Sequence, residues 1–412
     1  MRLAKTFELA AFGLLLFAVA ARGALAASGA DWPRWRGPTN DGVSAESDWT
    51  TEWPSEGPKV LWRASVGKGF SSVAVAAGRL YTMGNLGKTE DVVWCLDAET
   101  GKEIWSHRYR CREGDYPGPR ATPTVDGGAV YTLSREGHLF ALGAKDGKVL
   151  WSKEVVKDFG VQPSKHGWGL ACSPLVLGDR LILDLGKALA LEKKTGALVW
   201  ASGNDMAGFS SPTLTEAEGK TYVNCFTAHG LVLVEAAAGK EAARVRWETA
   251  WDVNAASPIV LGTKIFISSG YDAGCALYEW KGGKLAPVYT NRKMRNHCNS
   301  SVLYAGHIYG IDGQMGGSGR LRCLDFATGE IQWERRGSTP GGMIIAGGRI
   351  VALLDKGELL VARAAPERFE LLAQAKVLPG EQCWTSPVLS HGRLYCRSND
   401  KGQLVCLDVR TK

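Results

Sequence analysis

Several signatures that would assign an enzyme class or a membrane-embedded protein are missing from this 412-residue sequence. No Walker, G-x-G-x-x-G or G-x-S-x-G motif stands at a strand-to-helix junction, so nucleotide-binding and serine-hydrolase chemistry have no support. The ten cysteines include no C-x-x-C pair, and only His297-Cys298 places a histidine beside a cysteine. We therefore predict no metal site. After the N-terminal segment, no apolar run is long enough to span a bilayer.

Charge of one sign is also sparse. The 49 basic and 42 acidic residues give a formal net charge of +7, and the basic residues form no dense stripe. A protein that binds nucleic acid usually concentrates lysine and arginine on one face. We therefore expect no nucleic-acid partner.

The N-terminus has the organisation of a secretory signal peptide. Arg2 and Lys5 precede an apolar run over residues 9–21, and Ala24-Leu25-Ala26 provides a small-x-small cleavage site. Residues 1–26 are predicted to be removed near Ala26. Three positive residues and one negative residue go with them, which lowers the net charge from +7 to +5. We expect a periplasmic or secreted protein, without a lipid anchor because no cysteine lies near the cleavage site.

What the sequence does have is a repeated segment. Cys95-Leu-Asp-Ala-Glu-Thr-Gly-Lys-Glu-Ile-Trp105 returns at residues 323–333, and weaker copies end at residues 151 and 200. In each copy the aspartate can hold a turn, the glycine can supply a positive φ, and the tryptophan can cover the joint between neighbouring sheets. The residues assigned to this docking motif are Asp97, Gly101, Trp105, Trp151, Trp200, Asp325, Gly329 and Trp333.

The repeat predicts an all-β, eight-bladed β-propeller of four-stranded antiparallel blades over residues 58–412. Eight second strands follow one another at intervals of 40 to 51 residues, and the average is about 44 residues per blade. The last repeat stops before its outer strand, while an orphan strand stands at residues 59–66. Pairing residues 59–66 with residues 403–408 would close the ring and remove its open edges.

The Asp-x-x-Thr-Gly-Lys/Glu-x-x-Trp segments resemble the tryptophan-docking motifs of the pyrroloquinoline-quinone (PQQ)-like propeller superfamily. That superfamily includes quinoprotein alcohol dehydrogenases and the propeller lipoprotein of the bacterial outer-membrane barrel-assembly machinery. The resemblance covers essentially residues 58–412. The segment from Asp31 to Pro38 also resembles the opening of exported PQQ-like propellers of unassigned function. The resemblance therefore implies the fold and leaves both an enzyme and an assembly protein open.

Residues 27–57 form an arm rich in tryptophan and proline. We expect an extended strap across the outside of the ring that buries its indoles. The alternative is an exposed segment that binds a partner.

The cysteines divide into two groups. Cys95, Cys323 and Cys406 share one strand position in different blades, too far apart for disulfides, and are expected to be small buried packing residues. The pairing of the remaining cysteines stays open.

The longest non-repetitive segments are expected on one face, where the blade-to-blade connections open. Loops on a rigid scaffold often carry binding residues. The candidates for a ligand or partner face are Arg120, His166, Trp168, Trp251, Asp252, Asn254, Asp272, Arg295, His297 and Trp384. A planar anionic ligand could use the two arginines and stack on Trp168 or Trp384. In the alternative interpretation these residues only cap loops.

Two functions follow from this face. We favour an exported, non-catalytic binding or assembly propeller, a monomer without a cofactor, that presents the face to a protein or a polysaccharide. The alternative implied by the resemblance is a PQQ-dependent dehydrogenase, with calcium on Asp252, Asn254 and Asp272. Against that alternative, no two cysteines are adjacent, no C-x-x-C-H haem site occurs, and long insertions between blades are absent.

Overall fold

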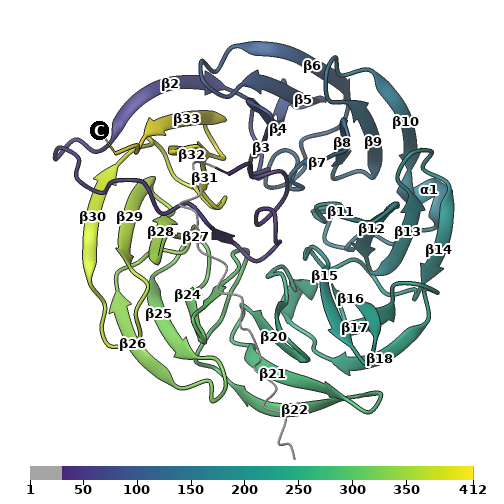
Figure 1. Cartoon of the computed structure of the whole chain (residues 1–412). Helices are drawn as coiled ribbons and strands as arrows, with labels where there is room; N and C mark the ends of the chain where they lie inside the picture. The colour runs from purple at the N-terminus through teal and green to yellow at the C-terminus, as the bar shows by residue number, and fades with distance from the viewer. Residues whose placement is uncertain (1–29, 412) are drawn as a thin grey trace, which may run out of the picture.

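The structure, a computed structural model, describes residues 30–411; the predicted signal peptide lies outside the described residues. Eight sheets surround a central axis (Figure 1). Each is four-stranded and antiparallel apart from one added parallel strand, so the predicted eight-bladed propeller is confirmed. The first strand of each blade lies nearest the axis and the fourth lies at the rim (Figure 1).

The blades follow one another along the chain. Blade one consists of β3 (Ala74–Ala76), β4 (Arg79–Leu86), β5 (Glu90–Asp97) and β6 (Glu103–Arg110), and blade two consists of β7 (Thr124–Asp126), β8 (Ala129–Leu133), β9 (His138–Gly143) and β10 (Val149–Glu154). Blade three consists of β11 (Leu175–Leu177), β12 (Arg180–Leu185), β13 (Lys187–Glu192) and β14 (Leu198–Ser202). Blade four consists of β15 (Thr213–Ala217), β16 (Lys220–Thr227), β17 (Gly230–Glu235) and β18 (Glu241–Arg246). Blade five consists of β19 (Ile259–Leu261), β20 (Lys264–Ser269), β21 (Gly274–Lys281) and β22 (Lys284–Asn291). Blade six consists of β23 (Val302–Tyr304), β24 (His307–Gly313), β25 (Gly319–Asp325) and β26 (Ile331–Arg336). Blade seven consists of β27 (Gly342–Ala346), β28 (Arg349–Leu353), β29 (Glu358–Arg363) and β30 (Leu371–Lys376).

The eighth blade combines the two ends of the propeller. The C-terminal strands β31 (Val388–Ser390), β32 (Arg393–Ser398) and β33 (Gln403–Asp408) are completed by β2 (Lys59–Ser65). The pairing is antiparallel and runs from Lys59 opposite Asp408 to Ser65 opposite Gln403. The predicted closure is therefore confirmed.

The burial of the strands explains why the blades need one another. In β13, four consecutive residues are buried, because both faces of the sheet pack against neighbouring blades. In the rim strand β10 only Trp151 is buried among exposed and half-buried residues. A single sheet would expose its apolar faces to water, so the blades are stable only as a ring. Two short helices, α1 (Val155–Phe159) and the 3₁₀ helix η1 (Ala250–Asp252), lie in connections between blades.

The docking motif joins blades through one repeated contact. Asp97 Oδ1 accepts hydrogen bonds from the backbone N and side-chain hydroxyl of Thr100, both at 2.8 Å, and the Thr100 bonds lower the pKa of Asp97. Gly101 then takes φ +70° and lies against the Trp62 indole of the preceding blade. Five indoles donate Nε1–H to a carbonyl of the next blade: Trp62 to Ala98 (3.2 Å), Trp105 to Ala144 (3.1 Å), Trp151 to Lys193 (3.0 Å), Trp200 to Ala236 (2.9 Å) and Trp333 to Ala365 (2.8 Å).

The N-terminal arm buries Trp32 and Trp49 as expected, but residues 32–44 lie inside the ring, so the expected path across the outside is wrong for this part. The backbone of Trp32 pairs with that of Val75 in blade one. Further along the arm, β1 (Val43–Ser44) adds a parallel strand to β27 on the axial side of blade seven. Between these points Trp35 donates to Ser257 Oγ at 3.1 Å and Arg36 donates to the Ser301 carbonyl at 2.9 Å. The arm therefore crosses the channel (Figure 1). The axial strands leave unpaired backbone groups, which the arm satisfies.

Two further observations concern disulfides and membrane spans. All ten cysteines are free in the structure, and Cys95, Cys323 and Cys406 are buried as expected. Among residues 30–411, no helix has the length and apolar character to cross a membrane.

We expect Gly101→Ala to destabilise the propeller more than Gly78→Ala. Both glycines have positive φ, so both variants carry the left-handed penalty of about 1–2 kcal/mol. A Cβ at position 101 would lie 2.6 Å from Trp62 Cδ2, whereas nothing lies within 4 Å of one at position 78. Overpacking should add about 1–3 kcal/mol at position 101. Urea unfolding of both variants measures the difference; equal losses would mean that the indole contact does not constrain the joint.

Candidate functional site

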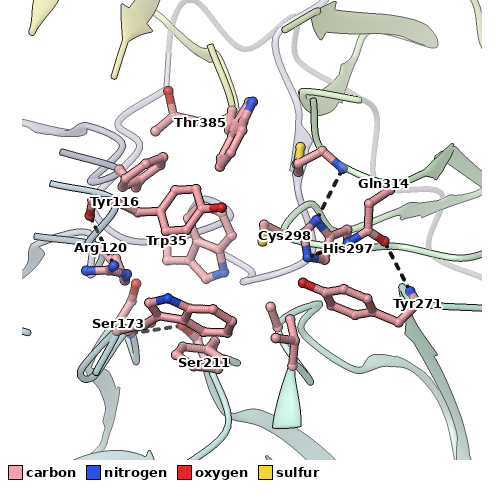
Figure 2. A pocket seen from close by; sticks show the side chains of 18 residues that line it. Trp35, Tyr116, Arg120, Ser173, Ser211, Tyr271, His297, Cys298, Gln314 and Thr385 are labelled. Carbon is pink, nitrogen blue, oxygen red and sulfur yellow. Dashed lines mark hydrogen bonds between the residues drawn. The ribbon is translucent and has the colours of Figure 1, made fainter. Parts of the chain in front are cut away.

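The candidate site is a cavity of about 240 Å³ at the axis of the ring, on the face where the blade-to-blade connections open. Its walls come from those connections and from the β20–β21 and β24–β25 turns, and its floor includes Trp35 of the arm (Figure 2). The lining consists of Trp35, Phe70, Tyr116, Arg120, Trp168, Ala171, Ser173, Phe209, Ser211, Val253, Ala255, Tyr271, His297, Cys298, Gln314, Met315, Trp384 and Thr385.

One position of the repeat recurs around the wall. The residue four places before the first strand of a blade lines the cavity in seven of the eight blades. These residues are Phe70, Arg120, Ala171, Phe209, Ala255, Cys298 and Trp384. In blade seven the equivalent residue, Ser338, is fully buried and does not line the cavity. Because the chain enters each blade with the same geometry, one sequence position supplies seven of the eighteen lining residues.

Aromatic rings make up the largest part of the wall. Trp384 lies against Phe70 with ring centroids 5.4 Å apart and against Tyr116 at 6.0 Å. Trp168 contacts Tyr116 edge-on at 6.2 Å and Phe209 at 5.9 Å. Such contacts hold the rings in fixed orientations and leave their free faces toward the cavity. The site is therefore suited to a flat or apolar group.

Arg120 is the cationic group of the lining. Its guanidinium donates to the carbonyls of Gly118 (3.0 Å), Asp115 (3.0 Å) and Tyr116 (3.1 Å), and it lies 5.8 Å from the Phe70 ring centroid. Burial, with a smaller contribution from Arg135, lowers the pKa of Arg120 to about 10. No carboxylate among residues 30–411 forms a salt bridge with it. Three of its five N–H donors are used, so it can still hold an anionic group.

His297 forms part of the opposite wall. Its Nδ1 accepts the Met315 backbone N–H at 3.2 Å, and its ring meets Tyr271 edge-on at 4.9 Å. Burial lowers the pKa of His297 to about 4. The ring is therefore neutral at neutral pH, and Arg120 remains the cation of the lining.

The structure brings four of the ten face candidates into this cavity: Arg120, Trp168, His297 and Trp384. Two others lie directly behind Trp168. His166 contacts the Trp168 ring at 5.4 Å, and Trp251 contacts it at 6.5 Å while remaining 56% exposed at the rim. His166 Nε2 is held 3.1 Å from the Asp252 carboxylate.

The side chains of the other four candidates do not converge on one point. Asn254 is fully buried and bonds the backbone of Thr227 (2.8 Å) and Ser269 Oγ (2.7 Å). Asp272 accepts from Arg295 at 2.6 Å, and Arg295 also binds Asp312 at 2.8 Å. Asp252, which also pairs with Lys165 at 3.4 Å, shares no partner with these residues. The three oxygen donors expected to hold calcium therefore serve three different contacts.

Sequence reasoning missed fourteen of the eighteen lining residues, among them Trp35, Phe70, Tyr116, Phe209, Tyr271, Cys298, Gln314 and Met315. A signal for Ala171, Phe209 and Ala255 was present. The residue two places before five of the six Ser-Pro or Thr-Pro dipeptides lines the cavity, and these three residues hold that place. Trp35 had no such signal, because its place depends on the path of the arm.

The fold and the axial site define an eight-bladed propeller of the PQQ-like superfamily. The sequence matches the family described as outer membrane protein assembly factor BamB over residues 54–115 and 112–335, more than half of the chain. The chain belongs to this family.

Individual relatives agree with this assignment. The outer membrane protein assembly factor BamB of Moranella endobia (strain PCIT) is 23% identical, over 74% of this chain and 81% of the relative. Its Escherichia coli (strain K12) counterpart is 27% identical, over 82% and 75%. Among solved structures, BamB from Moraxella catarrhalis has a TM-score of 0.63 at 16% identity, covering 85% of this chain and 99% of its own. Quinohemoprotein alcohol dehydrogenase from Comamonas testosteroni has a TM-score of 0.64 at 15% identity, covering 94% and 82%. The chain therefore shares its fold with both the BamB structure and the quinohemoprotein alcohol dehydrogenase structure.

The neutral state of His297 predicts a pH effect on stability. The pKa of His297 is about 4 in the folded protein, against an ordinary value of 6.5 for histidine. As the pH falls, His297 in the unfolded chain therefore binds a proton before His297 in the folded protein does. Stability should therefore decline between pH 6.5 and 4, by at most about 1.4 kcal/mol per pH unit. His297→Gln should lose this contribution, so the difference between parent and variant should shrink from pH 7 to 5. Urea unfolding across this range tests it; parallel profiles would refute the neutral assignment.

Proposed function

We propose that this protein is an exported, non-catalytic propeller that holds a protein partner by receiving one of its side chains in the axial cavity. The observation that carries the proposal is the composition of the wall: fixed aromatic rings, and one guanidinium, that of Arg120, without a salt-bridge partner among the described residues. Tryptophan, tyrosine and arginine are the types enriched at binding hot spots.

The size of the cavity supports a side chain as its occupant. Pockets for drug-sized ligands and cofactors have volumes of about 300–1,000 Å³, and this cavity measures about 240 Å³. A large apolar or aromatic side chain would pack between Trp168 and Trp384, and a neighbouring carboxylate would reach Arg120. The partner we propose is therefore a protein segment with an aromatic or large apolar residue beside an acidic one.

Family membership supports the same type of function. The sequence relatives from Moranella endobia and Escherichia coli, which match 74% and 82% of this chain, are named as outer membrane protein assembly factors. We propose by analogy that this chain acts in the periplasm and that its partner takes part in an assembly process there. The relatives do not specify the partner, so the cavity chemistry carries that part of the proposal.

The dehydrogenase alternative requires a quinone and calcium beside it, and the residues present do not fit calcium. Calcium is bound by six to eight oxygen atoms, several of them from carboxylates. The lining of the axial cavity, as far as residues 30–411 describe it, contains no aspartate or glutamate. Asp252 and Asp272 are each paired with a basic side chain instead. The cavity therefore lacks the ligand set that this chemistry uses.

We expect a photoreactive phenylalanine analogue at position 251 to cross-link to a protein in cells of the source organism. Trp251 is 56% exposed at the rim beside Trp168. The same analogue at Val288, 44% exposed on the outer strand β22, serves as the control and should give no specific adduct. Glycosidase treatment should leave the size of the adduct unchanged, whereas a glycosidase-sensitive adduct would indicate a polysaccharide partner.

The role of the cavity in partner binding is tested by introducing Trp168→Ala and Trp384→Ala into the protein that carries the photoreactive analogue at position 251. Loss of the adduct is expected, because the stacking surface is removed. The melting temperature of the double variant must show that the ring is folded. An adduct of unchanged yield in the folded double variant would remove the axial cavity from the proposal.

Adding PQQ and Ca²⁺ to the purified protein should leave its melting temperature unchanged. A ligand that binds only the folded state raises the apparent stability by mass action, by about 2.7 kcal/mol at a hundred times its Kd. Differential scanning fluorimetry with micromolar PQQ and millimolar Ca²⁺ gives the answer. A clear increase that requires both would favour the dehydrogenase.

A further inference from the structure

A second group of reactive side chains lies away from the axial cavity, between blades one and two. Cys111 follows β6 of blade one, Glu136 lies in the turn between β8 and β9, and His138 begins β9 of blade two. One ligand atom from each of the three lies within 4.8 Å of the others. None of the three lines the axial cavity. The group joins two blades and has no part in the proposed partner binding.

A buried carboxylate next to this group is incompletely satisfied. Asp91 is fully buried, and its Oδ1 accepts from Asn85 Nδ2 at 2.7 Å. Its Oδ2 is also buried and has no hydrogen-bond partner among the described residues. Asn85 Nδ2 donates to the Cys111 carbonyl as well, at 3.1 Å, which places this carboxylate beside the cluster. A buried polar atom without a partner is unfavourable. A cation in the neighbouring cluster would stabilise this carboxylate through its charge.

We propose that Cys111 Sγ, a ring nitrogen of His138 and the Glu136 carboxylate form a zinc-type divalent metal site with a fourth position for water. Zinc binds thiolate, imidazole and carboxylate, and a site with three protein ligands keeps the fourth tetrahedral position open. A hard cation such as Ca²⁺ or Mg²⁺ would be disfavoured by the thiolate and the imidazole. The donor set therefore selects a borderline first-row metal.

The surroundings of the cluster suit a bound ion. Ser134 Oγ lies 3.0 Å from His138 Nδ1 and accepts the backbone N–H groups of Glu136 (3.2 Å) and His138 (3.0 Å). Outer contacts of this kind orient metal ligands. The competing partner of Glu136 is Arg112, whose side chain is 82% exposed. An exposed ion pair is worth only about 0–1 kcal/mol, so it would not prevent metal binding.

Access to the site is asymmetric. Cys111 and Asp91 are fully buried, whereas the Glu136 side chain is 26% exposed and His138 is half-buried. An ion can therefore enter past Glu136 and reach the buried Cys111 thiol. Once bound, it would link the end of blade one to the second-to-third-strand turn of blade two. The sequence did not indicate this site, because the ligands lie in different blades and share no motif spacing.

The first test uses the reduced, metal-free protein with Zn²⁺ or Co²⁺ alone. We expect one equivalent of Zn²⁺ to bind and to raise the melting temperature. Co²⁺ should produce a thiolate-to-cobalt charge-transfer band in the near ultraviolet, which only a cysteine ligand creates. Because this measurement needs no variant, it does not depend on the folding of a mutant. Absence of the band in the parent protein overturns the proposal.

The second test assigns the ligands. Cys111→Ser should abolish the cobalt band, and His138→Gln should weaken Zn²⁺ binding at least about tenfold, the lower end of the loss seen even for outer-shell partners. Cys298→Ser is the matched control, since it removes the cysteine of the axial cavity and should leave the band and the Zn²⁺ affinity unchanged. Equal Zn²⁺ affinity in the parent, Cys111→Ser and His138→Gln would overturn the assignment, as would loss of the band in Cys298→Ser alone.

Discussion

The contact between a rim indole and the glycine turn of the next blade is the constraint on which the ring depends. Trp62, Trp105, Trp151 and Trp200 each lie against such a glycine, and each donates Nε1–H to a carbonyl in the same turn region. The turn needs glycine for two reasons, the positive φ and the space taken by the indole. Because an indole can occupy this position only when the neighbouring sheet is correctly placed, the contact sets the angle between blades.

The axial cavity is a consequence of that repeated angle. Because eight similar blades surround one axis, the residue four places before the first strand lines the channel mouth in seven of them. The ring therefore gathers Phe70, Phe209 and Trp384 from blades far apart in sequence. The arm then closes the space from below with Trp35, which reaches blade five through Ser257. The rigid ring, the repeated lining position and Trp35 of the arm together produce a defined site.

The charges of the long-loop face are mostly paired locally, and the axial cavity holds one cation. Asp272 is neutralised by Arg295, and His297 is kept neutral by burial. Arg120, by contrast, is held by backbone carbonyls. An arrangement with a single cation and fixed aromatic rings can orient a ligand.

The sequence alone determined the architecture of this protein, because the blade is a local unit whose turns, strands and docking tryptophan recur at a regular spacing. The eight blades, the closure by residues 59–65 and the family resemblance all followed from that recurrence. Only the tertiary structure decided the sites. Residues such as Arg120, Tyr271 and Trp35 meet because the ring closes, and the path of the arm is set by unpaired axial backbone. Cys111 and His138 lie close together across the joint between two blades, and this proximity corresponds to no repeated pattern in the sequence.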